Sequence, residues 1–229
     1  DQMPPANDTN HECNRRQFLT TALAGAGMVA AGPQWLSAAE RKKGQRKKKA
    51  AAPGQAAGGL ATDIVTLGPT GIKATRIAQG TGWNGSGRSS EHSRLGQEAF
   101  TKLVRHSIDQ GIAFMDTADL YGTMPYLGRA LKGVPQDKYI ALSKIWPREE
   151  YWNMPSGGAI KEVDRFRKEL NRDVLDICLI HCMTDSAWPK TYERIRDELS
   201  ELKQKGVVRA VGVSCHAVDA IKAAAALPW

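Results

Sequence analysis

The 229-residue sequence predicts an α/β protein built on a parallel sheet, and three observations carry this prediction. From Asp63 onward, short β-rich runs alternate strictly with segments of helical periodicity, which is typical of βαβ units. Hydrophobic residues make up 41% and charged residues 24% of the chain, as in ordinary globular proteins. The four cysteines include no CxxC pair, so no disulfide-rich framework is predicted.

The expected elements are a hairpin followed by five strand-helix units. The hairpin covers 64–67 and 72–75 around a Gly/Pro turn. The five strands are expected at 76–79, 113–116, 139–143, 175–180 and 209–213, with helical stripes at 100–108, 127–131, 163–170 and 195–202 and a further helix beginning after the fifth strand. This alternation suits either an open doubly wound sheet or part of a closed barrel, and periodicity alone does not separate the two.

A glycine pattern after the first strand resembles a dinucleotide-binding fingerprint. Residues 80–85 match GxGxxG, but that fingerprint opens directly into a helix and is followed by an acidic residue about 20 positions later. Here the polar stretch 86–96 intervenes, and no acidic residue ends a strand at that distance. The pattern is therefore weak support for a doubly wound fold.

Residues 1–39 have the order of a secretory signal. Arg15 and Arg16 precede a weakly apolar, Gly/Ala-rich stretch at 20–35, and small residues follow at 37–39. Three glycines in the stretch make an ordinary buried helix a poor alternative. The paired arginines resemble the twin-arginine type, which implies the twin-arginine export machinery as a partner and a periplasmic or other extracytoplasmic location. The segment is either cleaved after Ala39 or retained as an anchor.

Residues 40–60 are expected to be a basic, Ala/Gly-rich linker, and 61–229 the folded domain. Seven Lys and Arg residues between Arg41 and Lys49 account for all but one of the eight net positive charges. The rest of the chain has no basic excess, so no nucleic-acid partner is predicted. The linker is solvated or contacts an anionic surface. The sequence contains no uninterrupted apolar run of about 18 residues, so no stable membrane span is predicted.

Four polar residues stand at or just past the ends of three successive predicted strands. Asp116 and Tyr121 follow the second strand, Lys144 the third and His181 the fourth. Each residue alone has a purely structural explanation. Asp116 could cap a helix and Tyr121 could pack in the core, while Lys144 could be a surface charge and His181 a buried histidine. Together they favour a site, because the carboxyl ends of parallel barrel strands converge on one face.

These residue types suit carbonyl reduction by hydride, which builds negative charge on an oxygen and needs a proton donor beside it. A free tyrosine has a pKa near 10, and a neighbouring ammonium is expected to lower the pKa of Tyr121. A carboxylate behind Lys144 keeps that ammonium charged and oriented.

The segments that carry these residues resemble the aldo-keto reductase family. They are Asp-Thr-Ala-Asp-Leu-Tyr-Gly at 116–122, the lysine after the third strand, Leu-Ile-His at 179–181 and Gly-Val-Ser at 212–214. The resemblance runs from about Ile64 to the end of the chain. It implies a (β/α)8 barrel, of which only the first five strand-helix units are present, preceded by the hairpin. It also implies reduction of an aldehyde, ketone or sugar carbonyl with NADP(H), or alternatively NAD(H).

By this resemblance, four residues would be catalytic. Tyr121 would be the general acid, tuned by Lys144, which pairs with Asp116, and His181 would orient the carbonyl. The residues that would lie near the cofactor are Gly82, Trp83, Asp116, Ser214 and Cys215.

Several departures and alternatives remain. Cys215 stands where the family has asparagine, and Met124-Pro125 where it often has an acidic residue. With strands six to eight expected to be missing, two open sheet edges predict poor folding or aggregation of this chain alone, which a cooperative thermal transition would contradict. A non-catalytic, cofactor-binding regulatory subunit of the same fold is the alternative function.

The cysteines and the long loop at 146–158 suggest two further features. Cys182 and Cys215 lie beside His181 and His216, but the spacing matches no short zinc motif, and neither a metal site nor a disulfide is favoured. In the loop, an aromatic mouth for a cyclic carbonyl is expected from Trp146, Tyr151 and Trp152.

Overall fold

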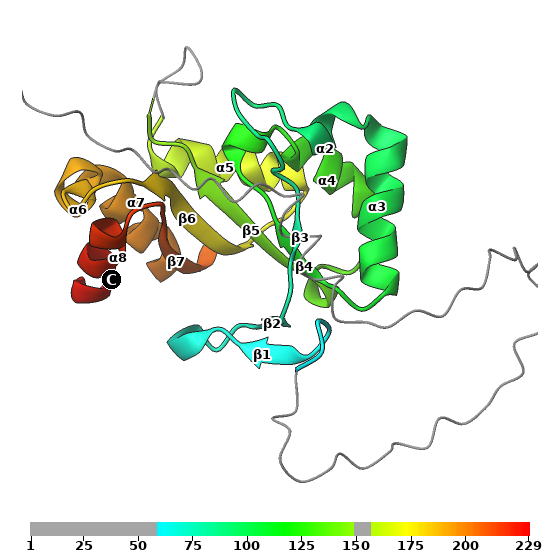
Figure 1. Ribbon diagram of the computed structural model, residues 1–229, viewed down its shortest axis with the longest axis horizontal. Coiled ribbons are helices and arrows are strands. Elements are labelled where there is room, and N and C mark those ends of the chain that lie inside the picture. The colour runs from blue at the N-terminus through cyan, green and yellow to red at the C-terminus, as the bar shows by residue number, and fades with distance from the viewer. Residues whose placement is uncertain (1–58, 149–156) are drawn as a thin grey trace, which may run out of the picture. The chain divides into compact units, whose positions relative to one another are not determined.

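The structure is a computed structural model that describes residues 59–148 and 157–229. The predicted signal (1–39) and nearly all of the predicted linker (40–60) lie outside these residues. Strands β1 (Ile64–Thr66) and β2 (Lys73–Thr75) form the expected antiparallel hairpin around the 3-10 turn η1 (Gly68–Thr70). The hairpin is followed by a five-stranded parallel sheet (Figure 1).

The order of the strands in this sheet separates a barrel from an open doubly wound fold. The strands are β3 (Gln79–Gly80), β4 (Phe114–Asp116), β5 (Ile140–Ile145), β6 (Leu175–Met183) and β7 (Val208–Cys215). Each strand pairs in parallel with the next one along the chain, in the order β3-β4-β5-β6-β7. A doubly wound sheet reverses its strand order at a switch point, whereas a (β/α)8 barrel does not. The sheet therefore has the topology of five consecutive barrel units.

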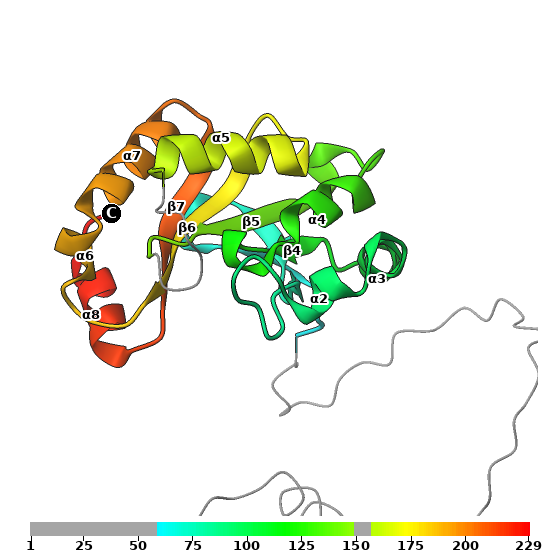
Figure 2. The ribbon, with the colours of Figure 1, turned by 90° about the horizontal axis from the view of Figure 1, so that it is seen from above.

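Helices follow the strands and cover one face of the sheet (Figure 2). They are α2 (Glu91–Arg94), α3 (Gln97–Asp109), α4 (Met124–Ala130), α5 (Ala159–Leu170), α6 (Trp188–Thr191), α7 (Glu193–Gln204) and α8 (Val218–Ala226), with 3-10 turns η2 (Asp119–Tyr121) and η3 (Gln136–Lys138). Their apolar stripes bury side chains such as Phe100, Phe166 and Leu199, each fully shielded from solvent. Full burial of such a side chain stabilises the fold by about 1.5–3 kcal/mol. None of the described helices is long and apolar enough to cross a membrane.

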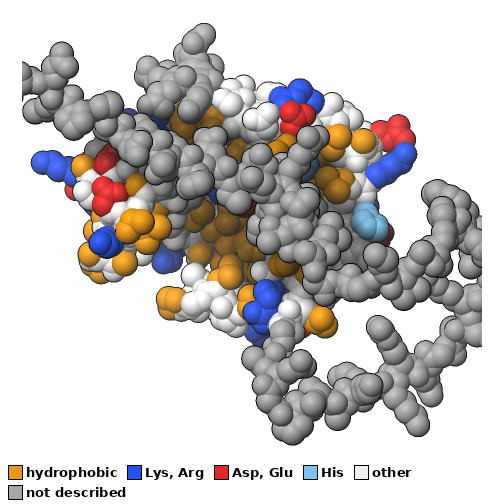
Figure 3. All heavy atoms as spheres, viewed as in Figure 1, with side chains coloured by type: hydrophobic (Ala, Val, Ile, Leu, Met, Phe, Trp, Pro, Cys, Tyr) orange, Lys and Arg blue, Asp and Glu red, His pale blue; other side chains and the backbone are white. Residues whose placement is uncertain are grey.

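A second, smaller apolar cluster lies on the opposite face of the sheet. Ile72 of the hairpin packs there with Ile177 and Ala210, and Phe114 and Leu142 are partly buried against them. Hydrophobic side chains gather in this part of the molecule, beside the hairpin, in Figure 3. The hairpin thus covers part of the face that turns inward in a barrel.

The first barrel strand is shorter than the sequence predicts. The backbone N–H groups of Arg76 and Ile77 donate to the carbonyls of Asp63 and Ala61, so these residues pair with the segment before the hairpin. Only Gln79 and Gly80 join the sheet, opposite β4.

The C-terminal ends of three later strands also differ from the predicted ones. Strands β5, β6 and β7 continue past the apolar runs because their ladder still pairs residues as far as Met183 with Cys215. Lys144, His181 and Ser214 therefore lie within the last residues of their strands. The final helix, α8, ends at Ala226. The next residue, Leu227, is extended, as residues before proline usually are.

Candidate active site

Tyr121 is positioned by a tight turn at the end of β4. The turn η2 is closed by the N–H of Tyr121, which donates to Ala118, and by Gly122 in the left-handed conformation. The tyrosine ring lies directly on two glycines of the loop after β3. A methyl group added at Gly82 would lie 2.3 Å from a ring carbon, and one at Gly85 would lie 2.7 Å from another. These glycines therefore provide the surface on which the ring rests.

Lys144 enters the same site from β5. It is only 6% exposed, and its ammonium donates hydrogen bonds to the Asp116 carboxylate and, at 3.1 Å, to the carbonyl of Thr117. Burial lowers the pKa of Lys144, while Asp116 opposes this shift. The ammonium also lies 4.9 Å from the centre of the Tyr121 ring, over its face.

His181, at the end of β6, lies between two aromatic rings. Its ring meets those of Tyr121 and Trp146 edge to face, each with centroids 5.5 Å apart. Its Nε2 atom lies 3.5 Å from the Tyr121 hydroxyl. Burial first, and then the positive charges of Lys144, His216 and Arg148, lower the pKa of His181 to about 3. The imidazole is therefore neutral near pH 7, and its buried Nδ1 has no hydrogen-bond partner among the described residues.

The expected effect of Lys144 on Tyr121 differs from what the structure gives. Burial, assisted by the negative charge of Asp116, raises the pKa of Tyr121 to about 12. The physical reason is burial of the phenol, which the Lys144 ammonium, bonded to Asp116 and lying over the ring, does not offset. The phenol of Tyr121 is thus protonated at neutral pH.

Tyr121 and His181 border a pocket of about 400 Å³. Its described lining residues are Gly82, Gly85, Ser86, Leu120, Tyr121, Trp146, His181, Cys182 and His216. Asp116 and Lys144 stand behind Tyr121 and do not line it. Trp83 is 67% exposed and lies outside the lining. The pocket brings together hydroxyl and imidazole donors with an apolar wall.

Ser214 and Cys215, which the sequence predicts near the cofactor, lie outside this lining. The Ser214 hydroxyl accepts a hydrogen bond of 2.8 Å from the N–H of Cys182, across the two strands. The next side chain, Cys215, packs against the main core beneath the helices, and burial raises its pKa. Sequence analysis did not single out His216 as a lining residue, although it directly follows the Gly-Val-Ser-Cys segment.

A bulge in β6 shapes the pocket next to His181. The register with β7 shifts between Ile180 and Met183, and Cys182 takes a left-handed conformation with φ of 66°. Arg148 donates to the Cys182 carbonyl and stacks over Trp146, with 4.9 Å between the guanidinium carbon and the ring centre. A bulge and a loop arginine of this kind leave no local pattern in the sequence.

The remaining predictions concern the loop and the cysteines. Trp146 is buried against His181, while Tyr151 and Trp152 lie outside the described residues. Cys182 and Cys215 are both free thiols. Within 59–148 and 157–229, no group of three or more His, Cys, Asp or Glu side chains is placed to hold a metal ion.

Comparison with known proteins agrees with this fold. A profile of the Aldo/keto reductase family matches residues 76–229. The chain is 33% identical over 170 residues to the 6-dehydroglucose reductase of Novosphingobium aromaticivorans, covering 69% of this chain and 53% of that protein. It is 28% identical over 168 residues to the aldo-keto reductase YhdN of Bacillus subtilis, covering 69% and 48%.

The fold is shared with solved structures of this class. A holo form of an aldo-keto reductase from Bacillus halodurans superposes with a TM-score of 0.56 at 24% identity, over 69% of this chain and 52% of that one. The chain belongs to the aldo/keto reductase family. It spans about half the length of the curated relatives it matches.

Proposed function

We propose that this protein is an NADP(H)-dependent oxidoreductase that reduces an aldehyde, ketone or sugar carbonyl, with Tyr121 as the general acid. The observation that carries the proposal is the approach of the Tyr121 hydroxyl to Nε2 of His181, 3.5 Å apart at the edge of one pocket. Family membership supports the class of reaction.

Two neutral donors suit the chemistry of a carbonyl oxygen. As hydride adds to the carbonyl carbon, negative charge grows on the oxygen and must be met by hydrogen bonds and then by a proton. Tyr121 is protonated at neutral pH and has a proton to give. His181 is neutral, so one ring nitrogen donates a hydrogen bond to the oxygen without competing as an acid.

Lys144 and Asp116 act behind the tyrosine. The ammonium over the ring face holds the ring in position, because a cation is attracted to the face of an aromatic ring. Asp116 holds that ammonium in place and opposes the lowering of its pKa by burial.

The donor set of the pocket fits a nicotinamide ring and an uncharged carbonyl. The described lining residues include no Lys, Arg, Asp or Glu, and the buried Nδ1 of His181 lacks a partner among the described residues. When bound, the nicotinamide supplies the hydride. Gly82, with Ser86 beside it, would border the ring. The described lining residues carry no group that would select a 2′-phosphate. NADP(H) is therefore proposed over NAD(H) on the family resemblance alone.

A test follows NADPH oxidation by absorbance over a panel of aldehydes, ketones and sugar lactols, with NADPH and NADH compared. Cofactor binding is measured in parallel by fluorescence. Turnover of a carbonyl supports the proposal. Tight cofactor binding without turnover on any member of the panel would contradict it and favour the regulatory subunit of the same fold.

A further inference from the structure

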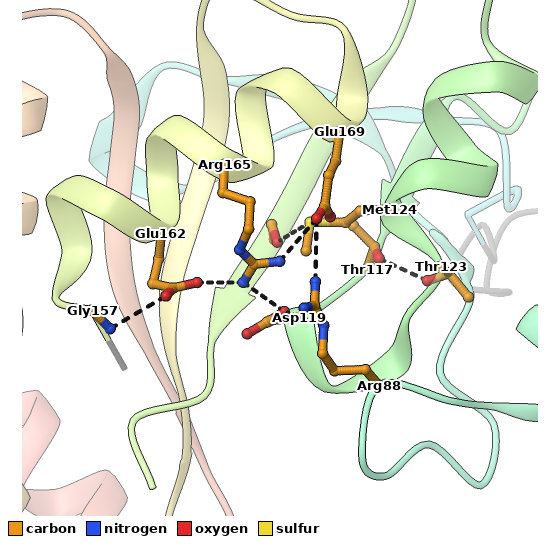
Figure 4. Close-up of polar contacts among 10 residues, drawn as sticks. Arg88, Thr117, Asp119, Thr123, Met124, Gly157, Glu162, Arg165 and Glu169 are labelled. Carbon is orange, nitrogen blue, oxygen red and sulfur yellow. Dashed lines mark hydrogen bonds and ion pairs between the residues drawn. The ribbon is translucent and has the colours of Figure 1, made fainter. Parts of the chain in front are cut away.

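A buried carboxylate that the proposed mechanism does not use lies two residues before Tyr121. The side chain of Asp119, the first residue of η2, is 1% exposed. One of its oxygens, Oδ1, lies 2.7 Å from Nη2 of Arg165 and 3.4 Å from Nε of Arg88 (Figure 4). A buried carboxylate between two guanidinium groups restrains the backbone that carries it, because moving it away would leave a buried charge unpaired.

The two arginines come from different parts of the chain. Arg88 belongs to the loop between β3 and α2, and Arg165 to α5. Both also contact the same oxygen of Glu169, at 3.2 Å from Arg88 and 3.0 Å from Arg165, and Arg165 pairs with Glu162 (Figure 4). The charged groups that surround Asp119 are thus two arginines and two glutamates.

This cluster joins the turn of Tyr121 to the loop on which the tyrosine ring rests. The loop that holds Arg88 also holds Gly82 and Gly85, the two glycines beneath the ring. At the other end of the turn, Gly122 packs so closely on this loop that an added methyl group would lie 1.9 Å from the Arg88 carbonyl oxygen. Asp119 forms its ion pair with Arg88 at the place where the turn and the loop meet.

We propose that Asp119 is a positioning residue for Tyr121, which holds the η2 turn against the 82–90 loop and α5 through Arg88 and Arg165. The effect on turnover rests on the proposed function. The mechanical part, a fixed loop and turn, does not depend on it.

The protonation of Asp119 makes this role testable through the pH dependence of activity. Burial, assisted by the negative charge of Glu162, raises the pKa of Asp119 to about 6 despite the opposing effect of Arg165 and Arg88. Above that pH the carboxylate holds both arginines, and below it the neutral acid releases them. Activity is therefore expected to fall as the pH drops through about 6. Tyr121 and His181, with pKa values of about 12 and about 3, do not titrate in this window.

The experiment compares the wild-type protein with Asp119→Asn and Glu169→Gln. Asparagine has the shape of the protonated acid, whereas Glu169→Gln removes a charge from the same two arginines without altering the turn. We expect Asp119→Asn to lower kcat at pH 8 by about tenfold or more, to roughly the wild-type value at pH 5, with no inflection near pH 6. Glu169→Gln is expected to keep the inflection and to stay within about threefold of wild type.

Hydrogen exchange of the 82–91 segment is measured on the same proteins. The N–H groups of Ser86, Ser89 and Glu91 are hydrogen bonded within this segment, and they are expected to exchange faster in Asp119→Asn but not in Glu169→Gln. Unchanged exchange in Asp119→Asn, or an equal change in both variants, would overturn the proposal. So would an inflection that survives in Asp119→Asn. Absence of turnover by the wild-type protein would instead refute the proposed function, and exchange would still decide the role of Asp119.

Discussion

The Tyr121 hydroxyl lies 3.5 Å from Nε2 of His181, although the two residues are 60 positions apart in the chain. Tyr121 follows β4 and His181 lies near the end of β6, so one strand of the sheet separates their origins. Because the phenol is protonated and the imidazole neutral near pH 7, both can donate to one oxygen in the pocket. This pair is the basis of the proposed activity.

The contact between Gly82 and the tyrosine ring predicts a steric loss of activity. Gly82→Ala would place a methyl group 2.3 Å from the ring and push the hydroxyl out of place. We expect kcat to fall by about 100-fold, since displacing a reacting group by about 1 Å has that effect. Gly80→Ala, two residues earlier, is the control, because a methyl group there meets nothing within 4 Å. Equal activity of the two variants would contradict the proposed position of Tyr121.

The buried pair of Lys144 and Asp116 predicts strong coupling. Lys144→Met leaves the carboxylate without its partner and is expected to lower the free energy of unfolding by about 1–3 kcal/mol. Adding Asp116→Asn should recover part of that loss, because no unpaired charge is then left. Urea unfolding of both single variants and the double variant measures the coupling. Simple additivity would show that the two residues act independently.

The neutral state of His181 predicts acid sensitivity. Its pKa is lowered from 6.5 to about 3, so the folded state binds this proton less well than the unfolded state does. The resulting stabilisation is complete above about pH 6.5 and is lost as the pH falls toward 3. Between pH 7 and pH 5, the wild-type protein should lose about 2 kcal/mol of unfolding free energy relative to His181→Gln. Parallel stability curves for the two proteins would contradict the shift.

Asp119 predicts the opposite pH dependence. Its pKa is raised from 3.8 to about 6, so its contribution favours folding at low pH and is lost as the pH rises through about 6. Asp119→Asn lacks this titration, so the stability of wild type relative to the variant should fall by up to about 3 kcal/mol between pH 4 and pH 8. Denaturant titrations at the two pH values measure this change. A stability difference that is the same at both pH values would contradict the shift.

The succession of strands along the chain and the positions of Tyr121, Lys144 and His181 near strand ends follow from local sequence, whereas the barrel order of the strands is expected only from the family resemblance. Polar side chains after apolar runs mark strand ends, and parallel strands bring those ends together. The exact ends do not follow, because ladder hydrogen bonds carry β6 on to Met183 beyond its apolar run. The rise in the pKa of Tyr121 depends on the burial of its side chain, and this is a tertiary property.

The Asp119 cluster could not be predicted for a similar reason. Arg88 and Arg165 lie far from Asp119 in the chain. The polar segments around them have the composition of an ordinary solvated surface. Only the packing of α5 and the 82–90 loop against η2 buries the carboxylate between them. Burial of a charged group is decided by such long-range contacts, which periodicity does not reveal.

The most direct test of the proposed activity compares carbonyl-dependent NADPH oxidation by wild type and Tyr121→Phe. Phenylalanine keeps the ring that packs on Gly82 and Gly85 and removes only the hydroxyl that faces His181. The proposal predicts a loss in kcat of about 10²–10⁴-fold, with NADPH binding unchanged. Equal turnover by the two proteins would contradict a tyrosine general acid and would assign proton donation to another group in the pocket.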